Sequence, residues 1–289
     1  MKFKFLHPTI LRILTLSAFF LSAGCDEIEP PYGNTGNDPL PNDSVVRKVL
    51  IEDFTGHKCQ ACPLAHREAS RLHGLFGDRL IVIALHADFW ALPSPTGAPS
   101  YTYDFRNTVA TQVATDFSVL GQPFPKGMVN RMINPGTGST WVMDWGSWED
   151  RVSEWLALPA DAGITMTSTY DSASRTITAG VNIKALNALN QDCELAVYFI
   201  EDEIINWQKD QTASPTDVSN YEHNHVLRGS LNGTYGENIG TLQAGQELNR
   251  SYSGTLTPSD ANPDKVKLVA ILSNSVTKEI IQAEEVSLK

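Results

Sequence analysis

Residues 54–63 read Phe-Thr-Gly-His-Lys-Cys-Gln-Ala-Cys-Pro, so that Cys59 and Cys62 are separated by Gln60 and Ala61. Residues 45–53, which precede them, are rich in β-branched and apolar side chains and indicate a strand. Residues 64–76, which follow, carry apolar side chains at helical spacing and indicate a helix. The two cysteines therefore lie where a strand passes into a helix.

This position gives the cysteine pair its predicted chemistry. The first backbone N–H groups of a helix have no partner within the helix, and the helix dipole places partial positive charge there. A thiolate at Cys59 is stabilised in that field, with His57 and Lys58 beside it. Cys62 lies one turn further on, close enough to resolve a mixed disulfide, and Pro63 suits the first helical turn. We therefore expect a redox-capable Cys59–Cys62 disulfide.

The same region resembles the thioredoxin superfamily. The resemblance rests on the strand, the cysteine pair, the helix, a second apolar strand over residues 80–88, and the sequence Gly-Gln-Pro-Phe-Pro at residues 121–125. It covers residues 45–158 and implies an α/β thioredoxin-like domain. Helices are expected over residues 105–117 and 148–156, where apolar positions recur on one face.

The resemblance also implies roles for individual residues. Asp53, which precedes the first cysteine in the predicted strand, corresponds to the family's buried aspartate and would accept the proton of the resolving thiol of Cys62. Pro125 would be the cis-proline that faces the cysteines, and the backbone of Phe124 would pair with a substrate strand. Cis X-Pro bonds are uncommon, which makes the claim for Pro125 specific.

A segment rich in proline and aromatic residues, 89–103, fits neither a helix nor a strand pattern. We expect it to pack beside the cysteines. It would either shape a groove for a substrate or form a lid over an otherwise exposed face.

Residues 1–24 have the pattern of an export signal. Lys2, Lys4 and Arg12 form a basic beginning, and an apolar core too short to span a bilayer follows. The end of this segment, Leu-Ser-Ala-Gly-Cys, resembles the bacterial lipoprotein box, which implies lipidation of Cys25. Residues 25–44 are rich in Pro, Gly, Asn and Asp and predict a flexible linker from the lipid to the domain. Export also implies a compartment in which disulfides persist.

The charge of the chain argues against several classes of partner. The whole chain holds 22 Lys and Arg against 33 Asp and Glu, and the export signal accounts for three of the cations and none of the acids. Its removal leaves 19 cations against 33 acids, a net charge of −14. Nucleic acids and anionic headgroups bind proteins with concentrated Lys and Arg. We therefore expect no nucleic-acid partner, and we expect the lipid to hold the protein to the membrane.

From residue 160 onward the pattern changes to short alternating runs between turn residues. Such a pattern predicts an antiparallel, immunoglobulin-like β-sandwich over residues 160–289. The predicted strands cover residues 164–169, 176–184, 194–201, 221–228, 247–256, 266–273 and 279–286.

Histidines and one cysteine outside the pair are further candidates. His223 and His225 alternate on the predicted strand 221–228, so both would project to one face, as two ligands of a metal or as a polar contact with the first domain. No further ligands can be assigned, and we expect no metal. His66 and His73 are most simply surface residues of the first helix, and Cys193 is expected to be a buried free thiol.

The two-domain plan, with residues 51–59 and 221–228, resembles the twenty-eight-kilodalton outer-membrane protein family of Gram-negative bacteria. This resemblance covers nearly the whole chain after the signal and implies a lipoprotein of the outer membrane. The function expected is thiol–disulfide exchange with a protein dithiol or disulfide substrate through Cys59 and Cys62, without a further cofactor. The competing hypothesis is a surface binding or adhesion lipoprotein in which the same disulfide only staples the start of the helix.

Overall fold

The computed structural model describes residues 45–95, 97–98, 100–133 and 142–289. The predicted signal peptide, Cys25 and the linker to residue 44 lie outside the described residues. The helices are α1 (Cys62–Phe76), α2 (Thr108–Asp116) and α3 (Trp148–Leu156), with short 3₁₀ turns at Gly77–Arg79, Phe89–Ala91, Trp145–Ser147 and Pro263–Lys265. The strands are β1 (Val49–Thr55), β2 (Leu80–His86), β3 (Lys126–Val129), β4 (Ala162–Asp171), β5 (Thr176–Ala185), β6 (Leu189–Glu201), β7 (Ile204–Lys209), β8 (Asp217–His223), β9 (Val226–Ser230), β10 (Glu237–Leu242), β11 (Glu247–Thr255), β12 (Val266–Asn274) and β13 (Ile280–Ser287).

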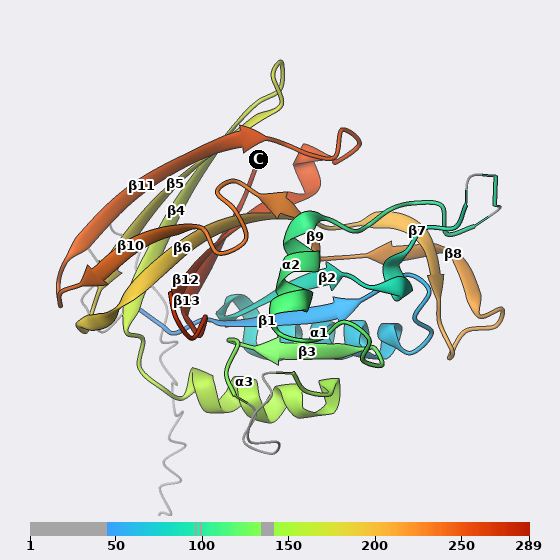
Figure 1. Cartoon of the computed structure of the whole chain (residues 1–289), viewed down its shortest axis with the longest axis horizontal. Helices are drawn as coiled ribbons and strands as arrows, with labels where there is room; N and C mark the ends of the chain where they lie inside the picture. The colour runs from blue at the N-terminus through green and yellow to red at the C-terminus, as the bar shows by residue number, and fades with distance from the viewer. Residues whose placement is uncertain (1–44, 96, 99, 134–141) are drawn as a thin grey trace, which may run out of the picture. The chain divides into compact units, whose positions relative to one another are not determined.

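Eight of the described strands form one mixed sheet (Figure 1), in the order β13-β12-β6-β9-β2-β1-β3 with β10 beside β6. β1 pairs parallel with β2 and antiparallel with β3. β9 joins the two halves of the chain, because it pairs parallel with β2 at Ala84 and Val226 and antiparallel with β6. The predicted domain boundary at residues 158–160 falls between α3 and β4, yet strands from both sides of it share this sheet.

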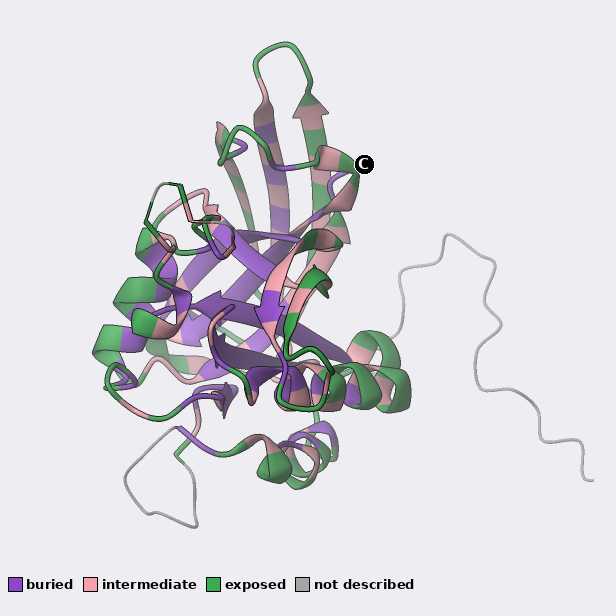
Figure 2. Cartoon of the chain, turned by 90° about the vertical axis from the view of Figure 1, so that its right-hand side faces the viewer, coloured by how far each residue is buried: buried purple, intermediate pink, exposed green. Residues whose placement is uncertain are grey.

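β1 and β2 are buried along their whole length because side chains pack on both faces of the sheet. Leu50 and Phe54 of β1 face a core that includes α2, whereas Val49 and Ile51 face a core that includes α1 and α3. Figure 2 shows these strands buried between helices whose outer surfaces are exposed. The cysteines thus begin a helix that rests on the most buried part of the sheet.

The prediction of a β-rich region after residue 160 is confirmed. β11, β5 and β4 form a three-stranded sheet that packs against β6 and β12 through a second core. Side chains of β6 alternate between two environments: Tyr198 and Ile200 face the core near the cysteines, and Val197 and Phe199 face the three-stranded sheet.

Two details differ from the predicted strands. Residues 221–228 are not one strand, because β8 ends at His223, β9 begins at Val226, and His225 adopts a left-handed φ of 58°. The sequence pattern does not predict β7 or β10. β7 and β8 form a separate two-stranded hairpin (β7–β8 hairpin), drawn in orange at the right of Figure 1.

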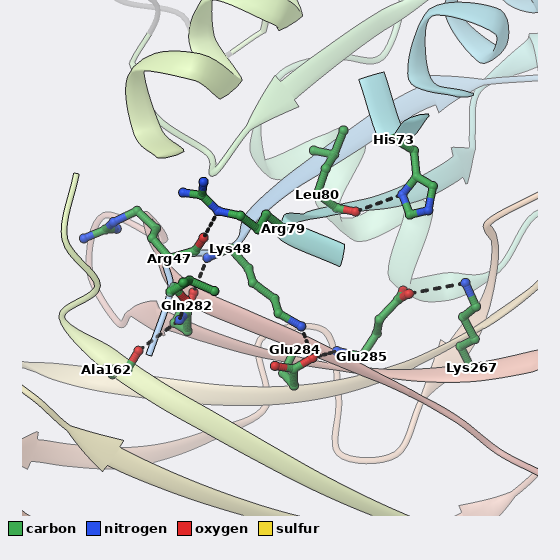
Figure 3. A network of polar contacts seen from close by, with 11 residues as sticks. Arg47, Lys48, His73, Arg79, Leu80, Ala162, Lys267, Gln282, Glu284 and Glu285 are labelled. Carbon is green, nitrogen blue, oxygen red and sulfur yellow. Dashed lines mark hydrogen bonds and ion pairs between the residues drawn. The ribbon is translucent and has the colours of Figure 1, made fainter. Parts of the chain in front are cut away.

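The segment before β1 is tied to the C-terminal strand (Figure 3). The Gln282 side chain accepts from the Lys48 N–H at 2.9 Å and donates to the carbonyls of Val46 and Ala162 at 3.1 and 3.0 Å. Lys48 also pairs with Glu284. Within the described part of the chain, no helix has the length and apolar character that crossing a membrane requires.

Candidate functional site

The cysteine pair lies at the first turn of α1 and is closed as a disulfide, with the Cα atoms of Cys59 and Cys62 5.4 Å apart. Cys62 is the first residue of α1, and Pro63 follows it in the first turn. The Cys62 backbone N–H donates to Cys59 Sγ at 3.1 Å. A donor at the helix N-terminus therefore points at the sulfur of Cys59, where it stabilises negative charge.

The β7–β8 hairpin packs against the loop that carries the disulfide. Cys59 is 1% exposed and Cys62 is 0% exposed, so the disulfide is buried. The contacts of the hairpin with the cysteine loop run from Lys209 N–H to the His57 carbonyl at 2.8 Å, from Gln211 N–H to the Gln60 carbonyl at 2.9 Å, and from Gln208 Nε2 to the Cys59 carbonyl at 2.9 Å.

Arg67, on α1, fixes the turn of the hairpin. Its Nη1 lies 2.9 Å from Asp210 Oδ2, and its Nη2 donates to Thr212 Oγ1 at 3.1 Å. Burial raises the pKa of Asp210, but the hydrogen bonds from Arg67 and Thr212 outweigh it and hold this pKa below its usual range. The hairpin is thus held to α1 by a charge-assisted contact and to the cysteine loop by backbone hydrogen bonds.

Residues 89–103 pack beside the cysteine loop, as expected. The Trp90 carbonyl accepts from the Lys58 N–H at 3.0 Å, and Tyr101 packs edge-on against His57 with ring centroids 5.4 Å apart. A Cβ at Gly56 would lie 2.4 Å from the Trp90 carbonyl carbon, so only glycine permits this approach. The hydroxyl of Tyr101 donates to Asp217, which connects this segment to the hairpin.

Phe124 and Pro125 lie just before β3, which pairs with β1. The Phe124–Pro125 peptide bond is cis. Phe124 is buried in the same hydrophobic cluster as Cys59 and Cys62. The structure therefore places Phe124 and the cysteine pair in one hydrophobic core, although they are distant from each other in the sequence.

Asp53 is buried in β1, and burial raises its pKa to about 8. Its Oδ1 has no hydrogen-bond partner among the described residues. Its Oδ2 lies 3.7 Å from His66 Nε2. Burial, with smaller contributions from His225 and Arg67, lowers the pKa of His66 to about 4. At neutral pH this contact therefore joins two uncharged groups rather than an ion pair.

The expectation that His66 is a surface residue is wrong. Its Nε2 is 2.8 Å from Thr55 Oγ1, and its Nδ1 is 2.7 Å from the hydroxyl of Tyr221 on β8. His73, further along the same helix, is half-buried and lies 3.2 Å from the Leu80 carbonyl. His66 thus links β1 to the hairpin through its ring.

The expectation that His223 and His225 alternate on one strand is also wrong, because the left-handed residue His225 separates β8 from β9. His223 Nε2 lies 3.3 Å from the Trp207 carbonyl, whereas His225 Nδ1 lies 3.3 Å from Asp202 Oδ1. No group of three or more His, Cys, Asp or Glu among the described residues is arranged to hold a metal. Cys193 is a buried free thiol, as predicted.

Sequence reasoning missed Arg67, Gln208 and Tyr221, whose importance depends on the hairpin. One signal was present: residues 202–220 form a connection between predicted strands that is longer than most loops without secondary structure. A further element was to be expected there. Its position over the cysteines was not indicated.

The chain is similar to one protein family and to several solved structures. The family model "Outer membrane protein Omp28" matches residues 110–289. No curated protein matches the chain. HBP35 of Porphyromonas gingivalis is similar at a TM-score of 0.62 with 17% identity, over 85% of this chain and 76% of that chain. A protein from Agrobacterium tumefaciens is similar at a TM-score of 0.50 with 14% identity, over 84% of this chain and 96% of that chain. These two likenesses concern the fold alone.

A third solved structure covers part of the chain. It is a domain of the outer membrane lipoprotein Omp28 from Porphyromonas gingivalis, with 19% identity and a TM-score of 0.32 over 45% of this chain and 89% of that chain.

Proposed function

The chain belongs to the Omp28 outer membrane protein family, and we propose that it is a lipid-anchored thiol–disulfide exchange protein of the outer membrane. Family membership associates it with the outer membrane. The proposal adds a lipid on Cys25, a tether over residues 26–44, a thioredoxin-like region over 45–158 and an immunoglobulin-like sandwich over 160–289. Cys25 lies outside the described residues, so mass spectrometry of the membrane-extracted protein is the test of lipidation.

The observation that carries the proposal is the hydrogen bond from the Cys62 N–H to Cys59 Sγ at the start of α1. This donor favours a thiolate on Cys59 in the reduced protein, and a thiolate is the form that attacks disulfides. The buried acid Asp53 and the position of Phe124 in the same hydrophobic core as the cysteines support the same interpretation.

The proposed mechanism begins with the reduced pair. The Cys59 thiolate attacks a disulfide of the substrate protein, forms a mixed disulfide and displaces one substrate thiolate. Asp53, once it has released its own proton, takes the proton of Cys62, and the Cys62 thiolate attacks Cys59 Sγ and displaces the second substrate thiolate. The substrate disulfide is reduced by two electrons, and the pair is oxidised by two. A dithiol reductant regenerates the pair, and the reverse sequence oxidises a substrate dithiol. The Phe124 backbone, beside Pro125, would pair with the substrate strand.

Exchange requires the β7–β8 hairpin to open. Its hydrogen bonds to the cysteine loop and the Arg67–Asp210 contact hold it against the loop in which the disulfide is buried. Local openings of this kind cost less free energy than global unfolding. A substrate would therefore react with a minor open state, at a rate set partly by the population of that state.

A second candidate function is favoured by the burial of the same disulfide. Cys59 and Cys62 are 1% and 0% exposed, which suits a structural staple in a binding or adhesion lipoprotein whose ligand site lies on the β-rich region. The two candidate functions differ in whether Cys59 and Cys62 undergo repeated cycles of oxidation and reduction.

The test is reduction of insulin disulfides by the full-length protein with dithiothreitol as the regenerating reductant. Turbidity from the precipitating insulin chain gives the rate. The proposal predicts a rate above that of dithiothreitol alone, which Cys59→Ser and Cys62→Ser abolish while Cys193→Ser leaves it unchanged. A wild-type rate equal to that of the Cys59→Ser protein would reject exchange activity and favour the staple.

A further inference from the structure

A cavity of about 190 Å³ lies between α1, β2 and the junction of β8 with β9. We call it the histidine cavity, because its lining includes His66, His86, His223 and His225, together with Asp53 and Tyr221. Neither the family nor the mechanism above accounts for this concentration of imidazole rings. Two of its lining residues, Tyr221 and His223, belong to the β7–β8 hairpin, which also contacts the cysteine loop.

Several polar atoms that line the cavity lack partners among the described residues. They are Asp53 Oδ1, both ring nitrogens of His86, and His223 Nδ1. Asp53 and His86 are each 1% exposed, and His223 is 2% exposed. An unsatisfied buried donor or acceptor costs about 1–3 kcal/mol, so these atoms need partners that the protein does not supply. A polar cavity of this size holds several water molecules.

The groups around the cavity are uncharged near neutral pH. Burial lowers the pKa of His223 to about 3 and that of His66 to about 4, and it lowers the pKa of His86 well below its usual value. Burial raises the pKa of Asp53 to about 8. The charged groups near the rim are Arg67 and Glu222, with Asp210 behind Arg67. An interior without fixed charge suits water rather than an ion.

The contacts of His66 connect this interior to the hairpin surface. Its Nε2 lies 3.7 Å from Asp53 Oδ2, a distance that one bridging water can span, and its Nδ1 lies 2.7 Å from the Tyr221 hydroxyl. Tyr221 is half-buried on β8. The order Asp53, water, His66, Tyr221 therefore leads from the buried acid to the edge of the molecule.

We propose that the histidine cavity holds ordered water through which Asp53 passes its proton outward, with His66 and Tyr221 as the positioning residues of this path. The inference rests on the proposed exchange activity. In the reduced protein the carboxyl proton of Asp53 moves through the water to His66 Nε2, and the Asp53 carboxylate formed in this way then takes the proton of Cys62. His66 releases its Nδ1 proton to Tyr221, whose hydroxyl proton leaves to solvent. One proton enters the path and one leaves it.

The experiment separates the two thiol steps. The reduced full-length protein is mixed with dithionitrobenzoate: attack by Cys59 releases the first thionitrobenzoate, and attack by Cys62 on the mixed disulfide releases the second. In Tyr221→Phe the second phase slows about tenfold or more, and its solvent isotope effect grows, because one link of the path is missing. The first phase becomes equal or faster, because the hairpin has lost a hydrogen bond to α1.

Two further variants complete the test. His66→Gln shows the same slow second phase, and the matched control His73→Gln, on the same helix but outside the cavity lining, matches the wild type. A second phase in Tyr221→Phe and His66→Gln with wild-type rate and pH profile would overturn the inference while leaving the exchange activity intact. A wild-type protein without a first phase would reject the proposed function and the inference together.

Discussion

Removing Arg67 should accelerate reduction of the disulfide by loosening the β7–β8 hairpin. Arg67→Ala deletes the 2.9 Å contact with Asp210 and the 3.1 Å hydrogen bond to Thr212. A half-exposed ion pair contributes about 0.2–1 kcal/mol, and an ordinary hydrogen bond contributes about 0.5–1.5 kcal/mol. Allowing for exposure of the arginine, the closed state loses about 1 kcal/mol relative to the open state, which raises the open population about fivefold.

The assay measures how fast dithiothreitol reduces Cys59–Cys62, with the new thiols trapped by iodoacetamide and counted by mass spectrometry. The matched control is Arg71→Ala, since Arg71 lies on the same helix with 48% of its side chain exposed against 50% for Arg67. Arg71 contacts Glu68 and Glu149 rather than the hairpin. An unchanged rate in Arg67→Ala, or an equal acceleration in both variants, would refute the reasoning.

Three other perturbations test the fold and the buried acid. Arg131→Met leaves the fully buried Glu52 without its bidentate partner and should lower the free energy of unfolding by about 3–5 kcal/mol. Adding Glu52→Leu to the same protein should recover most of this loss, as measured by urea unfolding. Gln282→Ala removes the bonds to Lys48, Val46 and Ala162 and should cost about 2 kcal/mol, visible as a lower Tm. The pKa of Asp53 is about 8 in the folded protein and about 4 in the unfolded chain. Between these two values only the native state binds the proton, so the stability of the wild type falls as the pH rises from about 4 to 8. Asp53→Asn should therefore gain stability over the wild type toward pH 8 in unfolding curves measured at several pH values, and an equal difference at all pH values would contradict this.

The local pattern of apolar and polar residues predicted the helices and strands around the cysteines, because that pattern is strong in each of these segments. The helix predicted at residues 64–76 is α1, which begins slightly earlier, at Cys62, and the helix at 148–156 is α3. The apolar runs that became β1 and β2 have no polar face, which is typical of strands covered on both sides.

The same reasoning could not predict which strands pair when they are distant in the sequence. β9 meets β2 through Ala84 and Val226, which lie in opposite halves of the chain and carry no mutual signal in one sequence. β7 and β8 are short and their apolar residues do not alternate regularly, and nothing in them indicated that Gln208 would bond to the Cys59 carbonyl. The sequence therefore predicted the cysteine pair but not the β7–β8 hairpin that packs against its loop.

The same limit explains the histidines. His223 and His225 fit the alternation of a strand, but the left-handed backbone at His225 ends that alternation. His66 lies on a face of α1 that the sequence alone assigns to solvent, and in the structure Tyr221 of β8 contacts it there. The cavity that gathers these rings lies between the consecutive elements β1, α1 and β2 and the β8–β9 junction, which is distant from them in sequence, and only the structure defines it.

The central claim is that Cys59–Cys62 is an exchange centre rather than a staple. Its most direct test is the reduction potential of the pair in the full-length protein, measured by equilibration with glutathione or dithiothreitol buffers. The account predicts a potential between about −120 and −270 mV, the range of exchange catalysts. A potential below about −300 mV, typical of structural disulfides, would contradict it and assign the function to the β-rich region.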